Sequence, residues 1–314
     1  MTYDILCPGE ALVEIMRTEI GQPLDAPALF TGPYPSGAPF IFAVQAARMG
    51  ASVGVIGCVG NDAFGDCLLR QLRADGMDDH LVTVSETQPT GTAFVAYNED
   101  GSRDFVFSPG AGAALHPGLL NATMFEGLGY LHLMGSTLSL HEDALAMGLR
   151  ALELADAAGA QVSFDPNIRP ELMPVEQAKV AFAPFIAAAD ILLPTADELT
   201  ALTGKATVAA ACEHLFVQKP ERLIVMTRGA AGCSVMTSES VTDVPAYHVD
   251  ERDPTGAGDC FDAGFLTRLL AGDNPAVAAQ WANACAGLAV TKQGPMAGAE
   301  KIDVVRQFMA DNPR

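Results

Sequence analysis

Short apolar runs alternate along the chain with longer segments in which apolar residues recur every three or four positions. Runs of the first kind predict buried strands, and segments of the second kind predict helices that cover them. From about residue 128 the alternation is regular. It predicts strands at 130–134, 161–165, 191–193, 223–227 and 233–237, and helices at 142–158, at 177–188, from 198, at 259–270 and at 276–290. Repeated strand–helix units predict a mostly parallel sheet with helices on both faces.

The N-terminal part contains the same units together with strands that do not fit them. The regular units are strands at 3–7 and 52–58 and helices at 40–49 and 64–75. The additional strands are at 11–17, 28–34, 92–97 and 103–107. The last two flank Asn98-Glu99-Asp100-Gly101, which predicts a hairpin turn rather than a calcium loop. We expect the segments 11–35 and 91–108 to form a small separate β-sheet, a lid over the main sheet.

Composition narrows the class of protein. The 314 residues are 49% hydrophobic and 18% charged, which suits one α/β domain over 1–314. A net charge of −20 repels nucleic acid and anionic membranes, so neither is expected as a partner. Seven cysteines without a C-x-x-C pair argue against a disulfide framework or a zinc site. With no signal-peptide pattern and no long apolar stretch, we expect a cytoplasmic protein.

The most informative segment for chemistry is Asp253-Pro254-Thr255-Gly256-Ala257-Gly258-Asp259, which stands directly before an apolar-periodic helix. A Gly-Ala-Gly turn at a helix N-terminus directs backbone N–H groups and the helix dipole at one small volume, which suits an anion. A carboxylate beside a transferred phosphoryl group accepts the proton of the attacking hydroxyl. Asp259 has that place, but an acid also simply favours a helix N-terminus. The local pattern leaves both interpretations open.

Further motifs carry a family resemblance. Asp253–Asp259 continues into a Phe-x-x-Gly-Phe pattern. The upstream matches are Gly9-Glu10-Ala11-Leu12-Val13-Glu14, Ser36-Gly37-Ala38-Pro39, Arg48-Met49-Gly50-Ala51, the glycine-rich 57–65 and Asp165-Pro166-Asn167-Ile168-Arg169-Pro170. In this order they resemble the ribokinase-like (PfkB) carbohydrate kinase family, and its fructokinase and 2-keto-3-deoxygluconate kinase branch. The resemblance implies a three-layer α/β/α sandwich with a β-sheet lid, and a homodimer formed through the lid.

The resemblance also implies roles for individual residues. Asp259 would be the catalytic base, and Gly256, Ala257 and Gly258 would form the anion hole. The sugar would contact Glu10, Gly37, Arg169 and Asp259. The implied ATP neighbours are Thr195, Thr227, Gly229, Gly232, Gly258 and Asn283.

Two metal ions are implied in addition to ATP. Glu198 would hold a hydrated Mg²⁺ through water, although an acid there also suits a helix N-terminus. K⁺ is implied as a second cation, with Gly298 standing where a serine ligand is found in relatives. Its positions are Asp253, Thr255, Ala289, Lys292 and Gly294.

The sugar-facing part departs from the family pattern. Ile41 stands where an Asn would hydrogen-bond the sugar, which implies rearranged contacts or a helix start shifted by one residue. Phe40 and Phe42 make this segment apolar. Thr195 replaces another family Asn. The segment 108–114 is small and neutral, which leaves Arg169 as the best cation for a phosphate or carboxylate.

We therefore expect an ATP-dependent kinase that phosphorylates a primary hydroxyl of a ketohexose such as fructose or tagatose. A 2-keto-3-deoxygluconate kinase is the second possibility and needs a cation for the substrate carboxylate. A nucleoside kinase is the third, because the Phe40–Phe42 stretch offers an apolar surface for a base. A catalytically silent sugar-binding or regulatory protein on the same fold is the alternative from another class.

Overall fold

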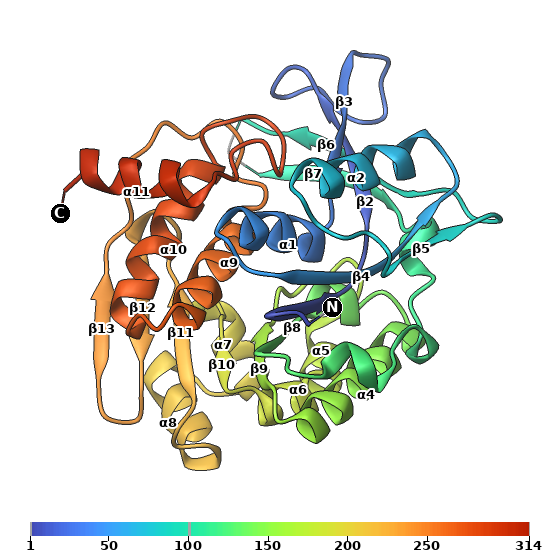
Figure 1. Cartoon of the computed structure of the whole chain (residues 1–314). Coiled ribbons are helices and arrows are strands. Elements are labelled where there is room, and N and C mark those ends of the chain that lie inside the picture. The colour runs from blue at the N-terminus through green and yellow to red at the C-terminus, as the bar shows by residue number, and fades with distance from the viewer. Residues whose placement is uncertain (1, 100–101, 314) are drawn as a thin grey trace.

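A computed structural model describes residues 2–99 and 102–313, and Figure 1 shows its arrangement. Among these residues a nine-stranded sheet has the order β13-β12-β11-β10-β9-β8-β1-β4-β5. Its strands are β1 (Ile5–Pro8), β4 (Val53–Gly60), β5 (Val82–Ser85), β8 (Tyr130–Met134), β9 (Gln161–Asp165), β10 (Ile191–Leu192), β11 (Leu223–Thr227), β12 (Cys233–Met236) and β13 (Val241–Val244). From β5 to β11 the paired strands are parallel, and β12 and β13 add an antiparallel end.

Helices cover both faces of the large sheet and complete three layers. One face packs against α1 (Ala38–Arg48), α2 (Ala63–Ala74), α9 (Ala257–Leu270), α10 (Pro275–Ala289) and α11 (Ile302–Asp311). The other packs against α3 (Gly135–Leu138), α4 (Glu142–Ala158), α5 (Val175–Ala181), α6 (Ala183–Ala188), α7 (Ala196–Thr203) and α8 (Val208–Gln218). Each of the two helical layers packs on the sheet through its own buried apolar cluster, as the predicted α/β/α architecture requires. No described helix combines the length and the apolar character that crossing a bilayer requires.

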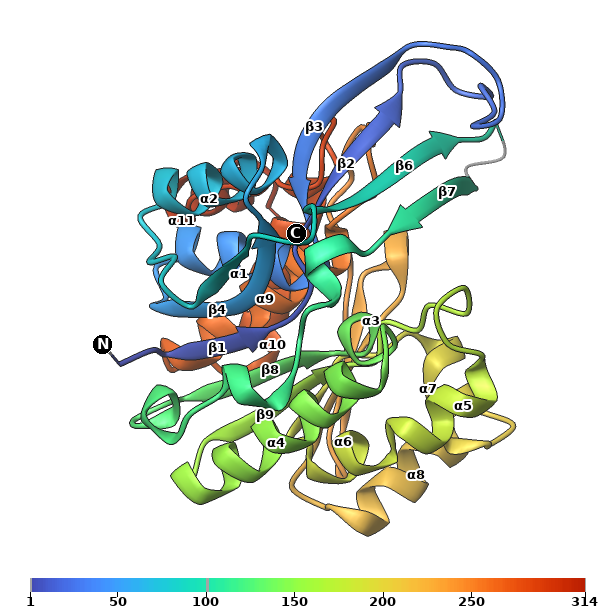
Figure 2. The same ribbon diagram turned by 90° about the vertical axis from the view of Figure 1, so that its right-hand side faces the viewer.

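The extra strands form a small separate sheet, as predicted. It consists of β2 (Leu12–Arg17), β3 (Phe30–Ser36), β6 (Gly91–Tyr97) and β7 (Arg103–Ser108), in the order β3-β2-β6-β7. Strands β2 and β6 run parallel, and their partners β3 and β7 are antiparallel to them. Figure 2 shows this sheet projecting beyond the large one. The predicted turn at Asp100 and Gly101 lies outside the described residues.

Several elements differ from the sequence expectation. The helix expected over 177–188 is divided into α5 and α6 at Phe182, because Pro184 in the first turn of α6 lacks an N–H group. The short strands β5 and β13, the helices α3, α8 and α11 and four 3₁₀ turns were not predicted. The turns are η1 (Gly110–Ala113), η2 (Pro117–Leu119), η3 (Ala122–Phe125) and η4 (Gly229–Ala231). The strands and the 3₁₀ turns are too short to show a clear period, whereas α11 has a clear apolar face that the sequence reasoning missed.

The parallel strands bring chemically useful residues to one edge of the large sheet. Glu10 follows β1, Ser136 follows β8, Asp165 ends β9, Thr195 follows β10 and Thr227 ends β11. These positions are at the carboxyl ends of neighbouring strands. In open α/β sheets, ligands bind in the crevice outside those ends, near the point where the strand order reverses. The fold therefore directs attention to this edge, which the small sheet borders.

Candidate active site

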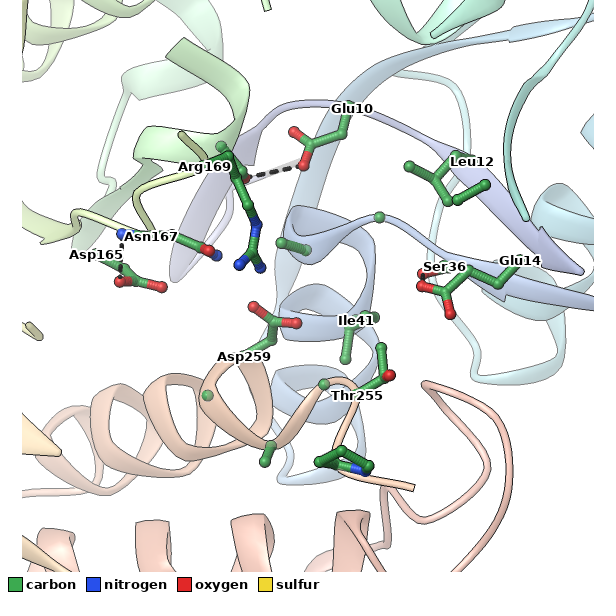
Figure 3. A pocket seen from close by; sticks show the side chains of 18 of the residues that line it. Glu10, Leu12, Glu14, Ser36, Ile41, Asp165, Asn167, Arg169, Thr255 and Asp259 are labelled. Carbon is green, nitrogen blue, oxygen red and sulfur yellow. Dashed lines mark hydrogen bonds between the residues drawn. The ribbon is translucent and has the colours of Figure 1, made fainter. Parts of the chain in front are cut away.

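A cavity of about 370 Å³ lies between the carboxyl edge of the large sheet, the N-terminus of α9 and the small sheet. Figure 3 shows Asp259, Arg169 and Glu10 directed into it. Of the residues predicted from sequence, eleven line this cavity: Glu10, Gly37, Arg169, Thr195, Glu198, Thr227, Thr255, Gly256, Ala257, Gly258 and Asp259. The structure thus brings together residues from six separated parts of the chain.

The turn before α9 is held from within by Asp253, whose side chain is almost fully buried. Its Oδ1 accepts a hydrogen bond from the Thr255 amide at 3.0 Å, and its Oδ2 accepts one from the Gly294 amide at 2.8 Å. Gly256 has φ of +83°, and a Cβ there would lie 2.6 Å from the Pro295 oxygen. Only glycine fits this conformation and this approach without strain.

Helix α9 begins without a side-chain cap. Its N-cap residue is Gly256, and no side chain accepts a hydrogen bond from the first turn. The Ala257 amide donates to the Pro254 oxygen at a long 3.4 Å. The other first-turn N–H groups and the helix dipole together favour an anion at that place. Because Ala257 and Gly258 open this helix at the cavity wall, the turn has the chemistry of an anion hole.

Asp259 lies in the first turn of α9 and is 7% exposed. Burial raises the pKa of its carboxyl to about 7, while the nearby Arg169 lowers it and Glu10 raises it. A carboxyl with that pKa is poised to accept and release a proton near neutral pH. In Figure 3 the Arg169 side chain extends toward the Asp259 carboxylate. Within the described ranges the Arg169 side chain forms no hydrogen bond or ion pair, so its guanidinium is available to a ligand.

Two buried glutamates face the cavity from the opposite side. Glu10 accepts hydrogen bonds from the hydroxyls of Ser136 (2.9 Å) and Thr137, and burial raises the pKa of its carboxyl. Glu14 accepts one from Ser36 at 2.7 Å, and its other oxygen has no partner among the described atoms. Burial raises the pKa of Glu14 to about 7. Both acids can therefore accept hydrogen bonds from ligand hydroxyls, and Glu14 still has an oxygen to offer.

A carboxyl pair forms the floor beside Asp259. Asp165 and Asp262 both line the cavity and are buried. Burial, together with the neighbouring carboxylates, raises the pKa of both. Beneath them His132 is fully buried, and burial lowers its pKa to about 3, which keeps the imidazole neutral. The pair adds hydrogen-bonding groups to the site without adding two full charges.

Several predicted residues contact the site only indirectly. Asn283 is buried and donates its amide hydrogens to the Val244 and Pro245 oxygens, both at 3.2 Å, so it supports the segment after β13. Gly229 begins η4 and Gly232 follows it, and both lie outside the cavity lining. Their roles beside ATP remain predictions.

Glu198 lines the cavity and also caps its own helix. Its carboxylate accepts hydrogen bonds from the amide and hydroxyl of Thr195 and from the Ile168 amide, at 2.8–2.9 Å. The capping interpretation of this acid is therefore correct. Since its oxygens already accept three hydrogen bonds, a role toward Mg²⁺ suits a water-mediated contact better than direct coordination.

The five residues expected around K⁺ lie on two adjoining segments, the turn before α9 and the end of α10 with the loop that follows it. They supply backbone carbonyls and the Asp253 carboxylate, which are oxygen donors of the type that K⁺ binds. Among the described residues, no backbone N–H group is paired with the carbonyl oxygens of Thr255, Ala289 and Lys292. A Cβ at Gly298 would lie 2.2 Å from the Ala289 oxygen, so a serine does not fit there. The donor set fits a cation bound by backbone oxygens.

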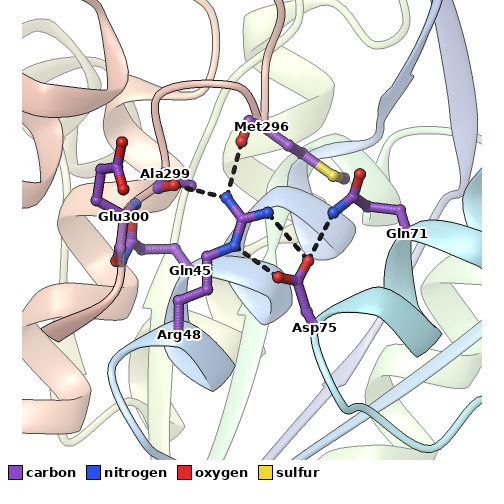
Figure 4. Close-up of polar contacts among 7 residues, drawn as sticks. All are labelled: Gln45, Arg48, Gln71, Asp75, Met296, Ala299 and Glu300. Carbon is purple, nitrogen blue, oxygen red and sulfur yellow. Dashed lines mark hydrogen bonds and ion pairs between the residues drawn. The ribbon is translucent and has the colours of Figure 1, made fainter.

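The loop after α10 is anchored from the outer side by α1 and α2 (Figure 4). Arg48 donates to the oxygens of Met296 (3.0 Å) and Ala299 (2.6 Å) and pairs with Asp75 at 2.7 Å. Gln45 exchanges two hydrogen bonds with the Glu300 backbone. The backbone oxygen of Pro295, in this loop, lies close to Gly256. The anchoring of the loop therefore also helps to position the anion-hole turn.

The cavity corrects one sequence-based interpretation. Phe40 and Phe42 are fully buried and lie outside the lining, because the described residues of α1 that face the site are Ala38 and Ile41, on another side of the helix. Phe42 stacks on His132 with ring centroids 4.0 Å apart. The aromatic side chains in the cavity are Phe105 and Phe107 of β7. The argument for a nucleoside based on the Phe40–Phe42 stretch is therefore wrong.

Sequence reasoning missed Glu14 and Asp262 as lining residues, and Tyr97 as a contact of the turn. A single acid within the apolar strand Leu12–Arg17 was a signal for Glu14. Asp262 follows Asp259 by three residues and shares its helix face. Tyr97 had no local signal, because its partner Asp253 is 156 residues away.

Comparisons with known proteins agree with this geometry. Fructokinase-1 of Oryza sativa subsp. japonica is 33% identical over 297 residues, covering 91% of both chains. The crystal structure of an E. coli protein provisionally described as ribokinase II, in complex with ATP and Mg²⁺, has a TM-score of 0.93 at 35% identity, covering 99% of this chain and all of that one. A Vibrio cholerae O395 fructokinase double mutant with fructose, ADP and potassium has a TM-score of 0.84 at 26% identity, covering 98% and 99%. Residues 24–302 match the pfkB family carbohydrate kinase profile. The chain therefore belongs to the pfkB family of carbohydrate kinases.

Proposed function

We propose that this kinase transfers the γ-phosphoryl group of ATP to a primary hydroxyl of a ketohexose, with fructose as the first candidate. The observation that carries the proposal is the buried Asp259 at an uncapped helix N-terminus, facing a cavity with hydroxyl-binding carboxylates. Fructokinases among the relatives support the choice of sugar.

The chemistry follows from the position of each group. Asp259 accepts the proton of the attacking hydroxyl, whose oxygen forms the new bond to phosphorus as the bond to ADP breaks. The N–H groups of Gly256, Ala257 and Gly258 are placed to stabilise charge on the transferred group. Mg²⁺ bound with ATP supplies positive charge for the phosphates, and Glu198 would hold it through water. Thr195 and Thr227, joined by a β-bridge, border the nucleotide in this proposal.

The charge of the cavity favours a neutral sugar over a sugar acid. Six carboxyl groups and two guanidinium groups line it. Glu10 and Glu14 have oxygens for sugar hydroxyls, while Arg169 is the cation nearest the base. A 2-keto-3-deoxygluconate carboxylate would pair with Arg169 but would meet these acids as well. We therefore place the sugar acid second.

A substrate panel tests the function. ADP release is measured with fructose, tagatose, 2-keto-3-deoxygluconate and several nucleosides, and ³¹P NMR locates the phosphate on the product. A ketohexose phosphorylated at a primary carbon is the expected result. Preference for the sugar acid would shift the assignment to the second candidate. If no compound releases ADP while fructose still binds in calorimetry, the protein is a catalytically silent binder.

We propose that the kinase activity depends on K⁺, because backbone carbonyl oxygens and the Asp253 carboxylate form a set of oxygen donors beside the anion hole. Rates in K⁺, in Na⁺ and in a buffer free of both are compared at constant ionic strength. The K⁺ rate is expected to be highest, because carbonyl oxygens on the two adjoining segments would be drawn together beside the anion hole. Equal rates in the three buffers would refute the dependence.

We also propose a homodimer through the small sheet. The sheet and its β2–β3 connection expose Ile20, Leu29, Phe30 and Val106, between 40% and 74% of each residue. Exposed apolar side chains on both edge strands and on the β2–β3 connection are suited to self-association. Light scattering after gel filtration should give twice the chain mass, and Leu29→Asp should reduce it. Free thiols at Cys7, Cys58, Cys67, Cys212, Cys260 and Cys285 support a reducing, cytoplasmic location, which cell fractionation would check.

A further inference from the structure

A hydrogen bond from the small sheet reaches the turn that precedes α9. Tyr97 is the last residue of β6, and its hydroxyl donates to Asp253 Oδ1 at 2.5 Å. The same hydroxyl lies 2.8 Å from Thr255 Oγ1. We propose that Tyr97 is a positioning residue that holds the anion-hole turn in its working shape while the small sheet covers the cavity.

The turn depends on Asp253 because few other groups hold it. Thr255 and Gly294 each donate one amide hydrogen to this carboxylate, and α9 has no side-chain cap. Tyr97 adds a third, short hydrogen bond to a carboxylate that is 1% exposed. Hydrogen bonds to an ionised acceptor are the stronger kind, and the loss of one from a buried carboxylate is costly. The position of Thr255, directly before Gly256, therefore depends on a residue of the other sheet.

Arg103 makes a second contact between the small sheet and the turn before α9. It lies opposite Tyr97 in the β6–β7 pair and donates from Nη1 to Thr255 Oγ1 at 3.2 Å. The Tyr97 ring packs beside the apolar cluster of the small sheet. Burial and the adjacent Asp253 raise the pKa of the Tyr97 hydroxyl far above its usual value, so it remains a donor at any working pH. Movement of the small sheet away from the cavity would break both contacts.

If Tyr97 positions the turn, the rate of phosphoryl transfer depends on whether the small sheet covers the cavity. This consequence rests on the proposed kinase function. When the small sheet is displaced, the turn loses the Tyr97 contact and its N–H groups are less well aligned. Transfer is then slow. When the sheet closes over a sugar, the contact forms and the turn is ordered. Tyr97 thereby links coverage of the substrate to the group that stabilises the transferred phosphoryl, which limits hydrolysis of ATP by water.

Tyr97→Phe tests this role, with Tyr34→Phe as the matched control. Tyr34 is in the same sheet, and among described residues its hydroxyl pairs with Thr31 at 2.9 Å, within that sheet. Both variants keep their rings and lose one hydroxyl. We expect Tyr97→Phe to lower kcat about tenfold, as for a modest misplacement of catalytic groups, while KM for the sugar changes less than about threefold. Tyr34→Phe should keep both constants.

Hydrogen exchange measured by mass spectrometry gives a readout that needs no turnover. Peptides covering 253–259 should exchange faster in Tyr97→Phe than in the wild type or in Tyr34→Phe, at equal thermal stability. An unchanged kcat and exchange rate would overturn the proposal. A loss shared by both variants, or confined to KM, would instead assign Tyr97 to packing of the sheet and overturn it too. If no sugar is phosphorylated, the proposed function fails, and the exchange result still decides the role of Tyr97.

Discussion

The two ends of the cavity are built in different ways. The anion-hole end consists of backbone, with Gly256, Ala257 and Gly258 at the start of α9. The sugar end consists of side chains from several elements, including Glu10, Glu14 and Arg169. Backbone sites require glycine at fixed spacings, so they can be recognised in the sequence. Side-chain sites depend on which strands meet, so Glu10 and Arg169 were named only through the family resemblance, and Glu14 became visible only in three dimensions.

The largest expected effect tests the junction of the two ends, where Asp259 serves both. Asp259→Asn should lower kcat at least about a thousandfold, because an amide cannot accept the hydroxyl proton. Nucleotide affinity, measured by calorimetry with an ATP analogue, should change little. The neighbouring Asp262→Asn is the control, because burial raises the pKa of Asp262 and an amide resembles the protonated carboxyl in shape and charge. Near-normal turnover in Asp259→Asn would remove the base from the mechanism.

The anion-hole end is examined by a pair of glycine variants. Gly256→Ala places a Cβ 2.6 Å from the Pro295 oxygen at a residue with φ of +83°. It should lower both the free energy of unfolding and kcat, the latter about a hundredfold, as expected for a lost anion-hole donor. At Gly258, in the first turn of the same helix, a Cβ would meet no described atom within 4 Å beyond the helix itself.

Gly258→Ala should therefore fold with undiminished stability, because alanine favours a helix over glycine by roughly 0.5–1 kcal/mol. Its methyl group would occupy open cavity space and lower kcat without lowering the melting temperature. Chemical denaturation and steady-state kinetics separate these two outcomes. Full activity of Gly258→Ala would mean that position 258 does not face the transferred group.

Much of the anion-hole end was predictable, and the sugar end was predictable only in part: Glu10, Gly37 and Arg169 were named through the family resemblance, whereas Glu14 was missed. Hydrophobic periodicity indicated the parallel sheet and the small sheet, and glycine spacing indicated the 253–259 turn. The break at Phe182 required the effect of Pro184, which periodicity ignores. The assignment of Phe40 and Phe42 to the site failed because the rotation of a helix about its axis is fixed by packing.

Arg169→Gln tests the sugar end through the pKa of the base. Burial raises the pKa of Asp259 to about 7, and Arg169 opposes that rise. Catalysis needs the ionised base, so kcat/KM for the sugar should increase with pH through about 7. Removal of the guanidinium raises the pKa of Asp259 further. The rising, low-pH part of the kcat/KM profile, its acid limb, should therefore move to higher pH. KM should rise about tenfold through loss of a charged hydrogen bond.

Arg169→Lys is the matched control because it keeps the charge and loses the planar fork. Its acid limb should remain close to that of the wild type while KM still rises. If Arg169→Gln leaves the limb in place, the titrating group is not Asp259. An increase in kcat/KM for a neutral sugar would indicate that Arg169 is adapted to an acidic substrate instead.

The smallest expected effect is a change in the free energy of unfolding, caused by the buried carboxylate of Glu14 at the sugar end. Burial raises the pKa of Glu14 from 4.5 to about 7, so the folded state favours its protonated form. The free energy of unfolding should therefore fall as pH rises from about 4.5 to about 7, where Glu14 becomes ionised without a full set of donors. Glu14→Gln removes this charge.

The variant should gain on the order of 1–3 kcal/mol at pH 8 and little at pH 4.5, as measured by urea denaturation at both values. The exposed Glu239→Gln should change by less than about 0.5 kcal/mol at either pH. Sugar affinity should fall in Glu14→Gln, because the unpartnered oxygen that destabilises the free enzyme is the one left for a ligand hydroxyl. If Glu14→Gln gains stability and still binds the sugar as tightly, the Glu14 carboxylate does not bind the substrate.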